Sequence, residues 1–457
     1  MNIETPKPLT HELPSQFSER LGIFYSSLVP AKHKKDNGQF FTPLDIARFM
    51  SALSTQCYTE HVKILDPGCG TAILSCCLIE HLSKSETVKT IDLTVYETDT
   101  SVNTYTRLSL EYIKTWLHEK NIELHFDIIN RDFILDNINC FKDVDNLFGS
   151  PDKGLFDIVI SNPPYFKLQK EDKRAVAAHK IVYGQPNIYS IFMYTAARLL
   201  KAGGELIFIT PRSFSSGNYF RAFREEIFKL LQPKHIHLFG SRTDTFNRDS
   251  VLQETLILKG VKADNISLDD TILLSHSAGV NDIFAPQLKN HVLNDLVDFT
   301  STEKIIHLPE SDDDERIIKL FKSWNGTLNK YGIKISTGPV VSFRAVEHLH
   351  RIYSNGTKHL VPLYQLHNTA KMKFTWPLEK KEKPQYIVQS DKTKSLLLPN
   401  KDYIFLRRFS AKDDKSRLVA TPYFSESVNE AFIGVENHLN YIYRPGGELS
   451  KIEIIGL

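Results

Sequence analysis

Cysteine is scarce in this chain, and the few that occur show neither the paired spacing of zinc ligands nor a disulfide framework. The 457 residues contain five cysteines, all in the first third of the sequence: Cys57, Cys69, Cys76, Cys77 and Cys140. This usage predicts a protein of a reducing cytoplasm. His235-x-His237 and His348-x-His350 alternate as strand residues can, but neither pair has a third ligand nearby in the sequence. We therefore expect no metal site.

Long apolar runs are missing as well. The first fourteen residues are polar and contain Pro6, Pro8 and Pro14, so they lack the apolar core of a signal peptide. No later run is long enough to cross a bilayer, and no membrane partner is expected. Hydrophobic residues make up 41% of the chain and charged residues 24%, which is ordinary for a globular protein with a large core.

Charge is distributed unevenly, although the net charge is only +2. From Tyr331 to Leu457 there are 19 Lys and Arg residues against 12 Asp and Glu residues, an excess of +7, so the preceding 330 residues carry −5. A basic C-terminal third on a mildly acidic body fits a polyanionic partner such as nucleic acid. A basic surface that is merely solvated would give the same count, and charge alone leaves both interpretations open.

Strand-like and helical segments alternate from Val62 to about Gly260. Strands are expected at Val62–Leu65, Ile91–Tyr96, Ile122–Ile129, Phe156–Ile160, Glu205–Ile209, His235–Phe239 and Thr255–Leu258. Helices are expected between them, at Ala72–Leu82, Val102–His118, Ile188–Leu200 and Phe220–Leu231. This alternation predicts an α/β fold with a mostly parallel, doubly wound sheet.

The chain is expected to consist of three parts: a mostly helical segment at residues 1–61, the alternating domain at 62–315, and a second domain at 316–457. The acidic run Ser311–Glu315 is expected to be a solvated turn or hinge, followed by a helix at Arg316–Trp324. From Tyr331 onward, short strand-like runs, prolines and basic residues dominate. The second domain is therefore expected to be strand-rich and to lack βαβ units.

The most informative motif is Ser161-Asn162-Pro163-Pro164-Tyr165-Phe166, which follows the apolar run Phe156–Ile160. The two prolines must end the strand, because proline has no backbone N–H to donate to a neighbouring strand. What remains is a rigid corner with an amide side chain, carbonyl groups that face no neighbouring N–H, and an aromatic ring. These groups suit a flat nitrogenous base, whose exocyclic amine needs acceptors and whose ring needs a stacking partner.

A glycine turn stands almost a hundred residues earlier, in Asp66-Pro67-Gly68-Cys69-Gly70-Thr71, between a strand and the helix that starts near Ala72. Glycine at such a turn lets the backbone approach a ligand closely. Glu97 ends the next strand, 27 positions after Gly70, where an acid can accept hydrogen bonds from both hydroxyls of a ribose. No third glycine follows at GxGxxG spacing, which argues against NAD and FAD.

Two more segments complete the expected cofactor site. Asp132 could accept a hydrogen bond from an adenine amino group while Phe133 covers the ring, although a helix cap or turn is the alternative interpretation of Asp132. Gly38-Gln39-Phe40-Phe41-Thr42-Pro43 precedes the first strand. This segment predicts a helix start with Thr42 as the N-cap and Pro43 at the first helical position. The glycine turn and the Asn162 corner together point to methyl transfer from S-adenosylmethionine to an amino nitrogen, and the exposed Phe40-Phe41-Thr42 stretch could also close over the methionine end of that cofactor.

The chain resembles the TaqI-like, gamma-class N6-adenine DNA methyltransferases of restriction–modification systems over residues 30–260. The motifs that carry the resemblance are, in order, Gly38-Gln39-Phe40-Phe41-Thr42-Pro43, Asp66-Pro67-Gly68-Cys69-Gly70, Glu97, Asp132 and Asn162-Pro163-Pro164-Tyr165. Segments 331–344, 407–417 and 436–441 also resemble the recognition domain of XhoI-type modification methylases. One departure is Gly70-Thr71-Ala72, where the family usually has Gly-Ser-Gly; Ala72 is small enough for a helix start.

The resemblance implies a Rossmann-like class I S-adenosylmethionine-dependent methyltransferase domain followed by a mixed, strand-rich DNA recognition domain. It implies that the Asn162 side-chain oxygen and the Pro163 carbonyl accept the two N6 hydrogens of adenine, so that this nitrogen can attack the sulfonium methyl in line. No covalent intermediate and no cysteine nucleophile are needed. The adenine must first be flipped out of the duplex. Tyr165 and Phe246 are the expected stacking partners; for Phe246 a core position is the alternative.

The resemblance and the motifs together give the following expected site, with S-adenosylmethionine as cofactor. The expected catalytic residues are Asn162, Pro163, Pro164 and Tyr165. The expected cofactor-binding residues are Phe41, Thr42, Pro43, Asp66, Gly68, Cys69, Gly70, Glu97, Asp132 and Phe133. The expected DNA-binding residues are Arg344, Arg407, Arg408, Lys412, Lys415 and Arg417. Double-stranded DNA and a separately encoded cognate restriction endonuclease are the expected partners of a monomer.

Two other functions remain open at this point. Glutamine methyltransferases that act on translation release factors share Asn-Pro-Pro-Tyr, but they lack the Gly-Gln-Phe-Phe-Thr-Pro segment and a basic C-terminal domain. A catalytically silent, DNA-binding specificity subunit is the second alternative. The presence of Glu97, Asp132, Asn162 and Tyr165 argues against it.

Overall fold

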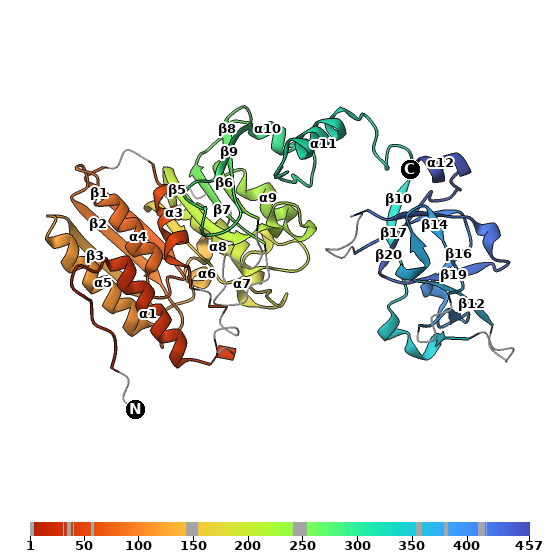
Figure 1. Cartoon of the computed structure of the whole chain (residues 1–457), viewed down its shortest axis with the longest axis horizontal. Helices are drawn as coiled ribbons and strands as arrows, with labels where there is room; N and C mark the ends of the chain where they lie inside the picture. The colour runs from red at the N-terminus through yellow and green to blue at the C-terminus, as the bar shows by residue number, and fades with distance from the viewer. Residues whose placement is uncertain are drawn as a thin grey trace. The chain divides into compact units, whose positions relative to one another are not determined.

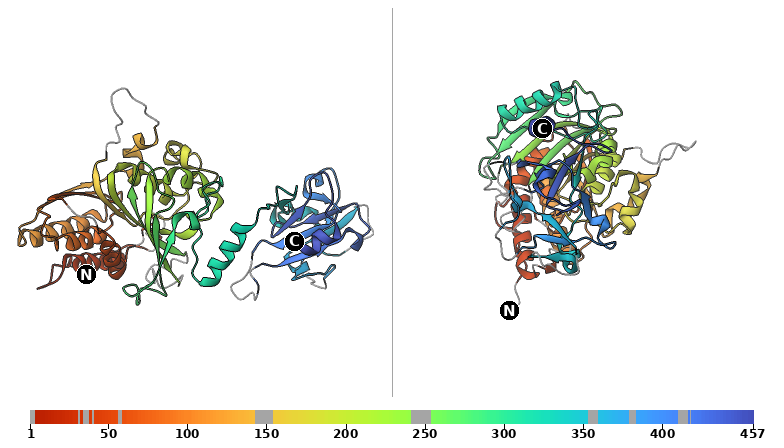
Figure 2. Two further views of the ribbon diagram at one scale, coloured as in Figure 1. Left: turned by 90° about the horizontal axis from the view of Figure 1, so that it is seen from above. Right: turned by 90° about the vertical axis from the view of Figure 1, so that its right-hand side faces the viewer.

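The computed structural model describes residues 4–30, 32–33, 38–39, 41–55, 59–142, 154–240, 254–352, 359–378, 383–409, 416 and 418–457. The chain divides into two compact units, Met1–Glu315 and Arg316–Leu457. The N-terminal unit is an α/β unit, and the C-terminal unit consists mainly of short strands (Figures 1 and 2).

A nine-stranded sheet with the order β3-β2-β1-β4-β5-β7-β6-β8-β9 forms the centre of the N-terminal unit. Its strands are β1 (His61–Pro67), β2 (Thr90–Tyr96), β3 (Glu123–Ile129), β4 (Phe156–Ser161), β5 (Leu200–Pro211), β6 (Leu231–Phe239), β7 (Thr255–Lys262), β8 (Thr271–Ser277) and β9 (Gln287–Val292). Strands β1 to β5 pair in parallel, whereas β7 runs antiparallel to β5 and β6. The predicted doubly wound, mostly parallel sheet is confirmed.

Helices cover both faces of this sheet (Figure 1). One face carries α3 (Leu44–Ala52), α4 (Ile73–Leu82) and α5 (Asn103–His118), with α1 (Pro14–Leu28) packed on α4 and α5. The other face carries α6 (Phe133–Asp136), α7 (Lys173–Ala177), α8 (Ile188–Leu199) and α9 (Arg221–Ile227). Consecutive residues of a strand point to opposite faces, so Ile158 and Val159 belong to different core clusters.

Two local predictions are wrong. Helix α3 begins at Leu44 with Pro43 as its N-cap, so Thr42 does not cap it. The Thr42 hydroxyl instead accepts a hydrogen bond from the side chain of Asn162. The acidic run is not a turn, because Asp312–Glu315 form the first turn of α11 (Asp312–Ser323). Carboxylates at that position are favourable beside the partial positive charge of a helix N-terminus.

The C-terminal unit contains a four-stranded and a five-stranded sheet plus a small hairpin. The first sheet joins β10 (Lys334–Thr337), β20 (Leu439–Tyr443), β17 (Tyr403–Arg407) and β18 (Ala420–Tyr423). The second joins β11 (Leu349–His350), β15 (Tyr386–Val388), β12 (Leu360–Tyr364), β19 (Phe432–Val435) and β16 (Leu397–Pro399), and the hairpin joins β13 (Thr369–Ala370) to β14 (Lys373–Phe374). Buried aromatic rings, among them Tyr364, Phe405 and Tyr423, form much of its core.

Helices of membrane-spanning length and hydropathy do not occur in the described part of the chain. The described residues also contain no group of three or more His, Cys, Asp or Glu side chains that could hold a metal ion. Four cysteines are described, namely Cys69, Cys76, Cys77 and Cys140, and all are buried free thiols.

The histidines of β6 are held as neutral side chains in the interior. His237 is fully buried, and its ring nitrogens lie 2.8 Å from Ser275 Oγ and 3.0 Å from Ser277 Oγ. Burial lowers the pKa of His237 to about 3 and that of His235 to about 4. The unfolded chain binds a proton near the ordinary histidine pKa of about 6.5, whereas the folded chain does not. The contribution of His237 to stability is therefore complete above pH 6.5 and is lost as the pH falls toward 3.

We expect His237→Gln to make folding stability less sensitive to acid. Between pH 7 and pH 5 the unmodified chain should lose about 2 kcal/mol more than the variant, because the unfolded state alone gains the proton over about 1.5 pH units. Urea denaturation of both proteins at the two pH values measures this difference directly, since other titrating groups act alike in both. An equal pH dependence in the two proteins would contradict the buried neutral state of His237.

Candidate functional site

A cavity of about 370 Å³ opens at the carboxyl ends of four parallel strands. Its lining includes Gly68 and Gly70 after β1, Glu97 after β2, Asp132 after β3 and Asn162 after β4. Ligands of open α/β sheets bind at this edge, where neighbouring strands leave a crevice. The topology therefore gathers motifs that lie up to a hundred residues apart in the sequence.

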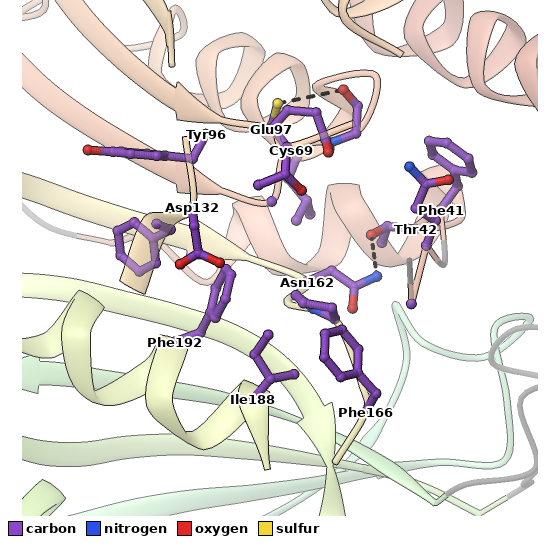
Figure 3. Close-up of a pocket in the computed structure, with 18 of the residues that line it drawn as sticks. Phe41, Thr42, Cys69, Tyr96, Glu97, Asp132, Asn162, Phe166, Ile188 and Phe192 are labelled. Atoms are coloured by element: carbon purple, nitrogen blue, oxygen red, sulfur yellow. Dashed lines mark hydrogen bonds between the residues drawn. The ribbon is translucent and has the colours of Figure 1, made fainter. Parts of the chain in front are cut away.

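The cavity has two chemically different sides. Figure 3 shows Tyr96, Asp132 and Phe192 on one side, and Thr42 and Asn162 on the other. The first side combines a carboxylate with aromatic rings, and the second brings an amide to a hydroxyl. An elongated ligand with an aromatic end and a polar end would match both.

The turn after β1 depends on left-handed backbone conformations. Gly68 has φ +81° and Gly70 has φ +53°, and a Cβ on Gly70 would lie only 3.0 Å from the Phe41 ring. Ala72, the N-cap of α4, also has a positive φ of 67°. A left-handed conformation disfavours a residue with a Cβ by about 1–2 kcal/mol, so glycine is the favoured residue at Gly68 and Gly70.

Glu97 lies against the glycine turn and lines the cavity. Its Oε2 accepts a hydrogen bond from the backbone N–H of Gly70 at 3.1 Å, and its Oε1 accepts from that of Asp99 at 2.9 Å. The residue is only 8% exposed, and burial raises its pKa while the two backbone donors oppose that rise. A carboxylate held this way retains acceptor capacity for donors that enter the cavity.

Asp66 lies near the end of β1, and Cys69 lies in the turn that follows it. Asp66 is fully buried and is not among the residues that line the cavity. Its Oδ2 accepts from the Ser75 hydroxyl at 2.6 Å, burial raises its pKa to about 7, and its Oδ1 has no hydrogen-bond partner among the described residues. Its predicted contact with a cofactor stays a prediction. Cys69 does line the cavity, and burial raises the pKa of its thiol well above the ordinary value.

Asp132 is both a helix cap and part of the cavity wall. Its Oδ1 accepts from the backbone N–H groups of Ile134 and Leu135 at 3.0 and 2.9 Å, and its Oδ2 lies 3.4 Å from Arg174 Nη1. Phe133, the next residue, lines the cavity and packs against Phe192 with ring centroids 5.1 Å apart. The cap interpretation and the ligand interpretation of Asp132 are therefore compatible.

The carboxamide of Asn162 is held at both of its ends. Its Nδ2 donates to Thr42 Oγ1 at 3.1 Å, and its Oδ1 accepts from the Tyr165 hydroxyl at 2.6 Å. The Ser161 hydroxyl donates to the Pro67 carbonyl at 2.7 Å, which ties the end of β4 to the end of β1. The amide thus faces the cavity in one fixed orientation, beside the glycine turn.

Tyr165 lies between Asn162 and the apolar core. Its ring packs against the apolar core, edge-on to Tyr189 at 6.3 Å, and its hydroxyl also lies 3.0 Å from the Ile209 carbonyl oxygen. Tyr165, Pro163 and Pro43 are not among the residues that line this cavity, whereas Pro164 is. The stacking role of Tyr165 stays a prediction, and Phe246 lies outside the described residues.

Several lining residues were not predicted from the sequence. Phe166 and Arg174 lie in the segment between β4 and α8, and Ile188 and Phe192 lie on α8. The Arg174 guanidinium is 5.7 Å from the centre of the Phe166 ring. The segment has no hydrophobic periodicity that would have indicated its fold. The only available signal was the aromatic residue that directly follows Asn-Pro-Pro-Tyr.

The predicted DNA-binding arginines of the C-terminal unit have unequal positions. Arg344 and Arg408 are exposed, and each guanidinium lies over the ring of an exposed neighbour, Phe343 at 5.4 Å and Phe409 at 5.3 Å. Arg407 is half-buried and donates hydrogen bonds to the carbonyl and the hydroxyl of Thr369. Lys412, Lys415 and Arg417 lie outside the described residues.

A solved structure has a fold similar to that of this chain. The type IIG restriction endonuclease BpuSI is similar over 94% of this chain and 56% of that one, with a TM-score of 0.51 and 14% identity. This similarity concerns the fold alone, and it agrees with the predicted α/β fold of the N-terminal unit, in which β7 runs against the parallel strands.

Comparison with known sequences gives the family. Residues 45–246 match the model of the Eco57I restriction-modification methylase. The Type II methyltransferase M.BsuBI of Bacillus subtilis is 34% identical over 435 residues, which cover 93% of this chain and 82% of that protein. The Type II methyltransferase M.PstI of Providencia stuartii is 30% identical over 413 residues, which cover 90% and 78%. The chain belongs to the Type II restriction–modification methyltransferase family that includes these two proteins.

Proposed function

We propose that this chain transfers a methyl group from S-adenosylmethionine to the N6 nitrogen of an adenine that is flipped out of double-stranded DNA. The observation that carries the proposal is the position of Asn162. Its carboxamide shares one cavity with Glu97 and Asp132, the two acids proposed to hold the cofactor. Reacting groups placed together in this way gain rate from alignment.

The cavity residues fit the cofactor by their chemistry. Glu97 offers carboxylate oxygens to the ribose hydroxyls, and Asp132 offers an acceptor to the adenine amino group, with Phe133 beside it. Gly68 and Gly70 leave room for close approach of a ligand to the backbone, where a side chain on Gly70 would meet Phe41. When bound, the cofactor supplies a methyl group on a positively charged sulfur.

Asn162 would make the target nitrogen reactive. The Asn162 side-chain oxygen and the Pro163 carbonyl are proposed to accept the two N6 hydrogens, which moves this nitrogen toward sp³ geometry and frees its lone pair. Thr42 fixes the amide orientation in advance, so little rearrangement is needed as positive charge develops. Cys69 takes no part as a nucleophile, because burial disfavours its thiolate.

The C-terminal unit is proposed to recognise the DNA target. Its excess of basic residues and the exposed Arg344 and Arg408 support contact with phosphates. The Arg408 side chain also donates to the Asn437 carbonyl at 3.3 Å, and the adjacent Phe409 ring lies 5.7 Å from the His438 ring. Exposed aromatic and basic side chains therefore lie together around Arg408, a combination that suits binding of nucleic acid.

The proposed role in the cell is protection of host DNA from a cognate restriction endonuclease, encoded separately. The family membership supports this role. We propose that the protein acts as a monomer, since each unit has its own core and DNA methylation of one strand needs one active site.

The proposal is tested by the fate of a labelled methyl group. Purified protein should move label from S-adenosylmethionine to plasmid DNA, and the treated plasmid should resist one restriction enzyme of a panel. Label that appeared only in added bacterial protein would instead support the glutamine methyltransferase alternative. DNA binding without any label transfer would support the silent specificity subunit.

Replacement of the two neighbouring arginines should separate DNA binding from folding. We expect Arg408→Ala to weaken DNA binding and to reduce the salt dependence of affinity by about one released counterion, because an exposed phosphate contact is lost. Arg407→Ala should instead lower the stability of the C-terminal unit, since its bonds to Thr369 are internal. Fluorescence anisotropy with labelled duplexes over a salt series, together with thermal unfolding, measures both. The reverse pattern would contradict these assignments.

Tyr165→Phe should separate the role of the Tyr165 hydroxyl from the role of its ring. The hydroxyl orients Asn162 in the structure, so its loss should lower the rate of methyl transfer about two- to tenfold, the effect of one hydrogen bond. DNA affinity should not change. Tyr165→Ala should in addition weaken capture of the flipped base if the ring stacks on it. Duplexes with 2-aminopurine at the target report flipping by fluorescence; equal signals from both variants would remove the stacking role.

A further inference from the structure

A second acid stands two residues after Glu97 and has a different set of partners. The Asp99 side chain is only 9% exposed. Its Oδ2 accepts hydrogen bonds from the Tyr25 hydroxyl at 2.9 Å and from Gln39 Nε2 at 2.7 Å, and it lies 2.7 Å from His33 Nε2. Its Oδ1 accepts from the backbone and hydroxyl of Ser101 at 2.9 and 2.6 Å.

The two oxygens of Asp99 serve separate purposes. The contacts of Oδ1 are local and form a turn around Asp99 itself, a common use of aspartate. The contacts of Oδ2 are not local, because Tyr25, His33 and Gln39 precede Asp99 by 60 to 74 positions. Burial opposes ionisation of Asp99, yet the donors together hold its pKa well below the ordinary value. A turn alone does not explain the contacts of Oδ2.

Among the distant partners, Gln39 belongs to the segment that walls the cavity, and Tyr25 of α1 packs against that segment. Gln39 lines the cavity, and the chain continues directly into Phe41 and Thr42, which also line it. The Tyr25 ring, held by Asp99 through its hydroxyl, meets the Phe41 ring edge-on with centroids 5.8 Å apart. Phe41 in turn sits against Gly70 of the glycine turn. The position of this wall is therefore linked to Asp99 through Gln39 and through Tyr25.

Glu97 cannot replace this link. Its carboxylate contacts the backbone of Gly70 and Asp99, and it faces the cavity. Asp99 is not among the cavity-lining residues. Two acids thus follow β2. Glu97 faces the cavity, whereas Asp99 binds side chains of the N-terminal region.

We propose that Asp99 is a positioning residue that latches the segment around Gln39, Phe41 and Thr42 onto the rim of the cofactor cavity. The inference rests on the proposed function only in naming the ligand as S-adenosylmethionine. With the latch in place, Phe41 covers the glycine turn and Thr42 holds Asn162. Without it, the segment should open, and the ligand should leave faster.

The latch is tested first on the protein without ligand. Limited proteolysis with trypsin can cut after Lys32, which directly precedes His33 in the sequence. We expect Asp99→Asn to raise the cleavage rate roughly tenfold, since a charged partner of several hydrogen bonds is lost. His33→Ala, which removes one partner from the other side, should raise it less.

Asp92→Asn is the matched control. Asp92 lies on β2, which ends three residues before Asp99, and it also pairs with a histidine, His61, at 2.7 Å, but on the surface away from the cavity. The Asp92→Asn variant should be cleaved by trypsin at the same rate as the unmodified chain. Calorimetry and stopped-flow should then show that Asp99→Asn weakens binding of S-adenosylmethionine roughly tenfold through faster release, whereas Asp92→Asn does not.

Each outcome separates the latch from the proposed function. If cleavage and cofactor release of Asp99→Asn equal those of the unmodified chain, the latch is wrong although the methyltransferase proposal stands. If cleavage rises as expected while no protein binds S-adenosylmethionine, the latch is supported and the identity of the ligand is wrong.

Discussion

Asn162→Ala is expected to lower the rate of methyl transfer by about 10²- to 10³-fold while leaving cofactor and DNA binding intact. The amide oxygen matters most when positive charge develops on N6, so its loss affects the transition state more than the bound ground state. The magnitude is that of one preorganised polar group removed from an active site. Single-turnover kinetics with saturating DNA isolates this step from product release.

Asn162→Asp provides the matched variant for this prediction. It keeps two acceptor oxygens near the Tyr165 hydroxyl but loses the Nδ2 donor to Thr42. It should therefore retain more activity than Asn162→Ala. An Asn162→Ala enzyme that methylates DNA at nearly the unmodified rate would remove Asn162 from the mechanism.

The largest effect on stability is expected from Lys259→Met. Lys259 on β7 is 10% exposed and pairs with Glu205 on β5, which is 1% exposed, at 2.8 Å. The Ser54 hydroxyl also donates to Glu205, at 2.5 Å, and Lys259 donates to the Thr55 hydroxyl at 2.7 Å. Removal of the lysine leaves a buried carboxylate without its counter-charge, which should lower the free energy of unfolding by about 3–5 kcal/mol.

Lys201→Met is the control. Lys201 pairs with Asp157 at 2.7 Å, a distance similar to that of the Lys259 pair, but the Lys201 side chain is 39% exposed. It should cost less than about 1 kcal/mol. Adding Glu205→Gln to Lys259→Met should restore part of the loss, since a buried amide needs no counter-charge. Urea denaturation measures all four proteins. Equal losses from the two lysine substitutions would show that burial of the Lys259 pair has no energetic consequence.

The sequence predicts those helices and strands whose apolar residues recur with a regular period. All seven expected strands and the four expected helices of the N-terminal unit occur, because each has an apolar face that the sheet buries. Strands β8 and β9 were not predicted as additions to the sheet. Most of Gln287–Val292 is exposed, so β9 is an edge strand held by backbone pairing with β8 and carries little apolar signal.

The site was predictable where residues follow strand ends. Glu97, Asp132 and Asn162 come directly after β2, near the end of β3 and after β4, and parallel topology brings such positions together. Phe166 was missed because its segment has no periodicity. Asp99 was missed because its role depends on partners 60 or more positions away, which only the folded chain brings near it.

The most direct test of the central claim is the chemical identity of the methylated base. DNA treated with the purified protein and S-adenosylmethionine can be digested to nucleosides and analysed by mass spectrometry. The account predicts N6-methyladenine as the product, present with the unmodified chain and nearly absent with Asn162→Ala. A methylated cytosine in its place, or N6-methyladenine at equal levels with both proteins, would contradict it.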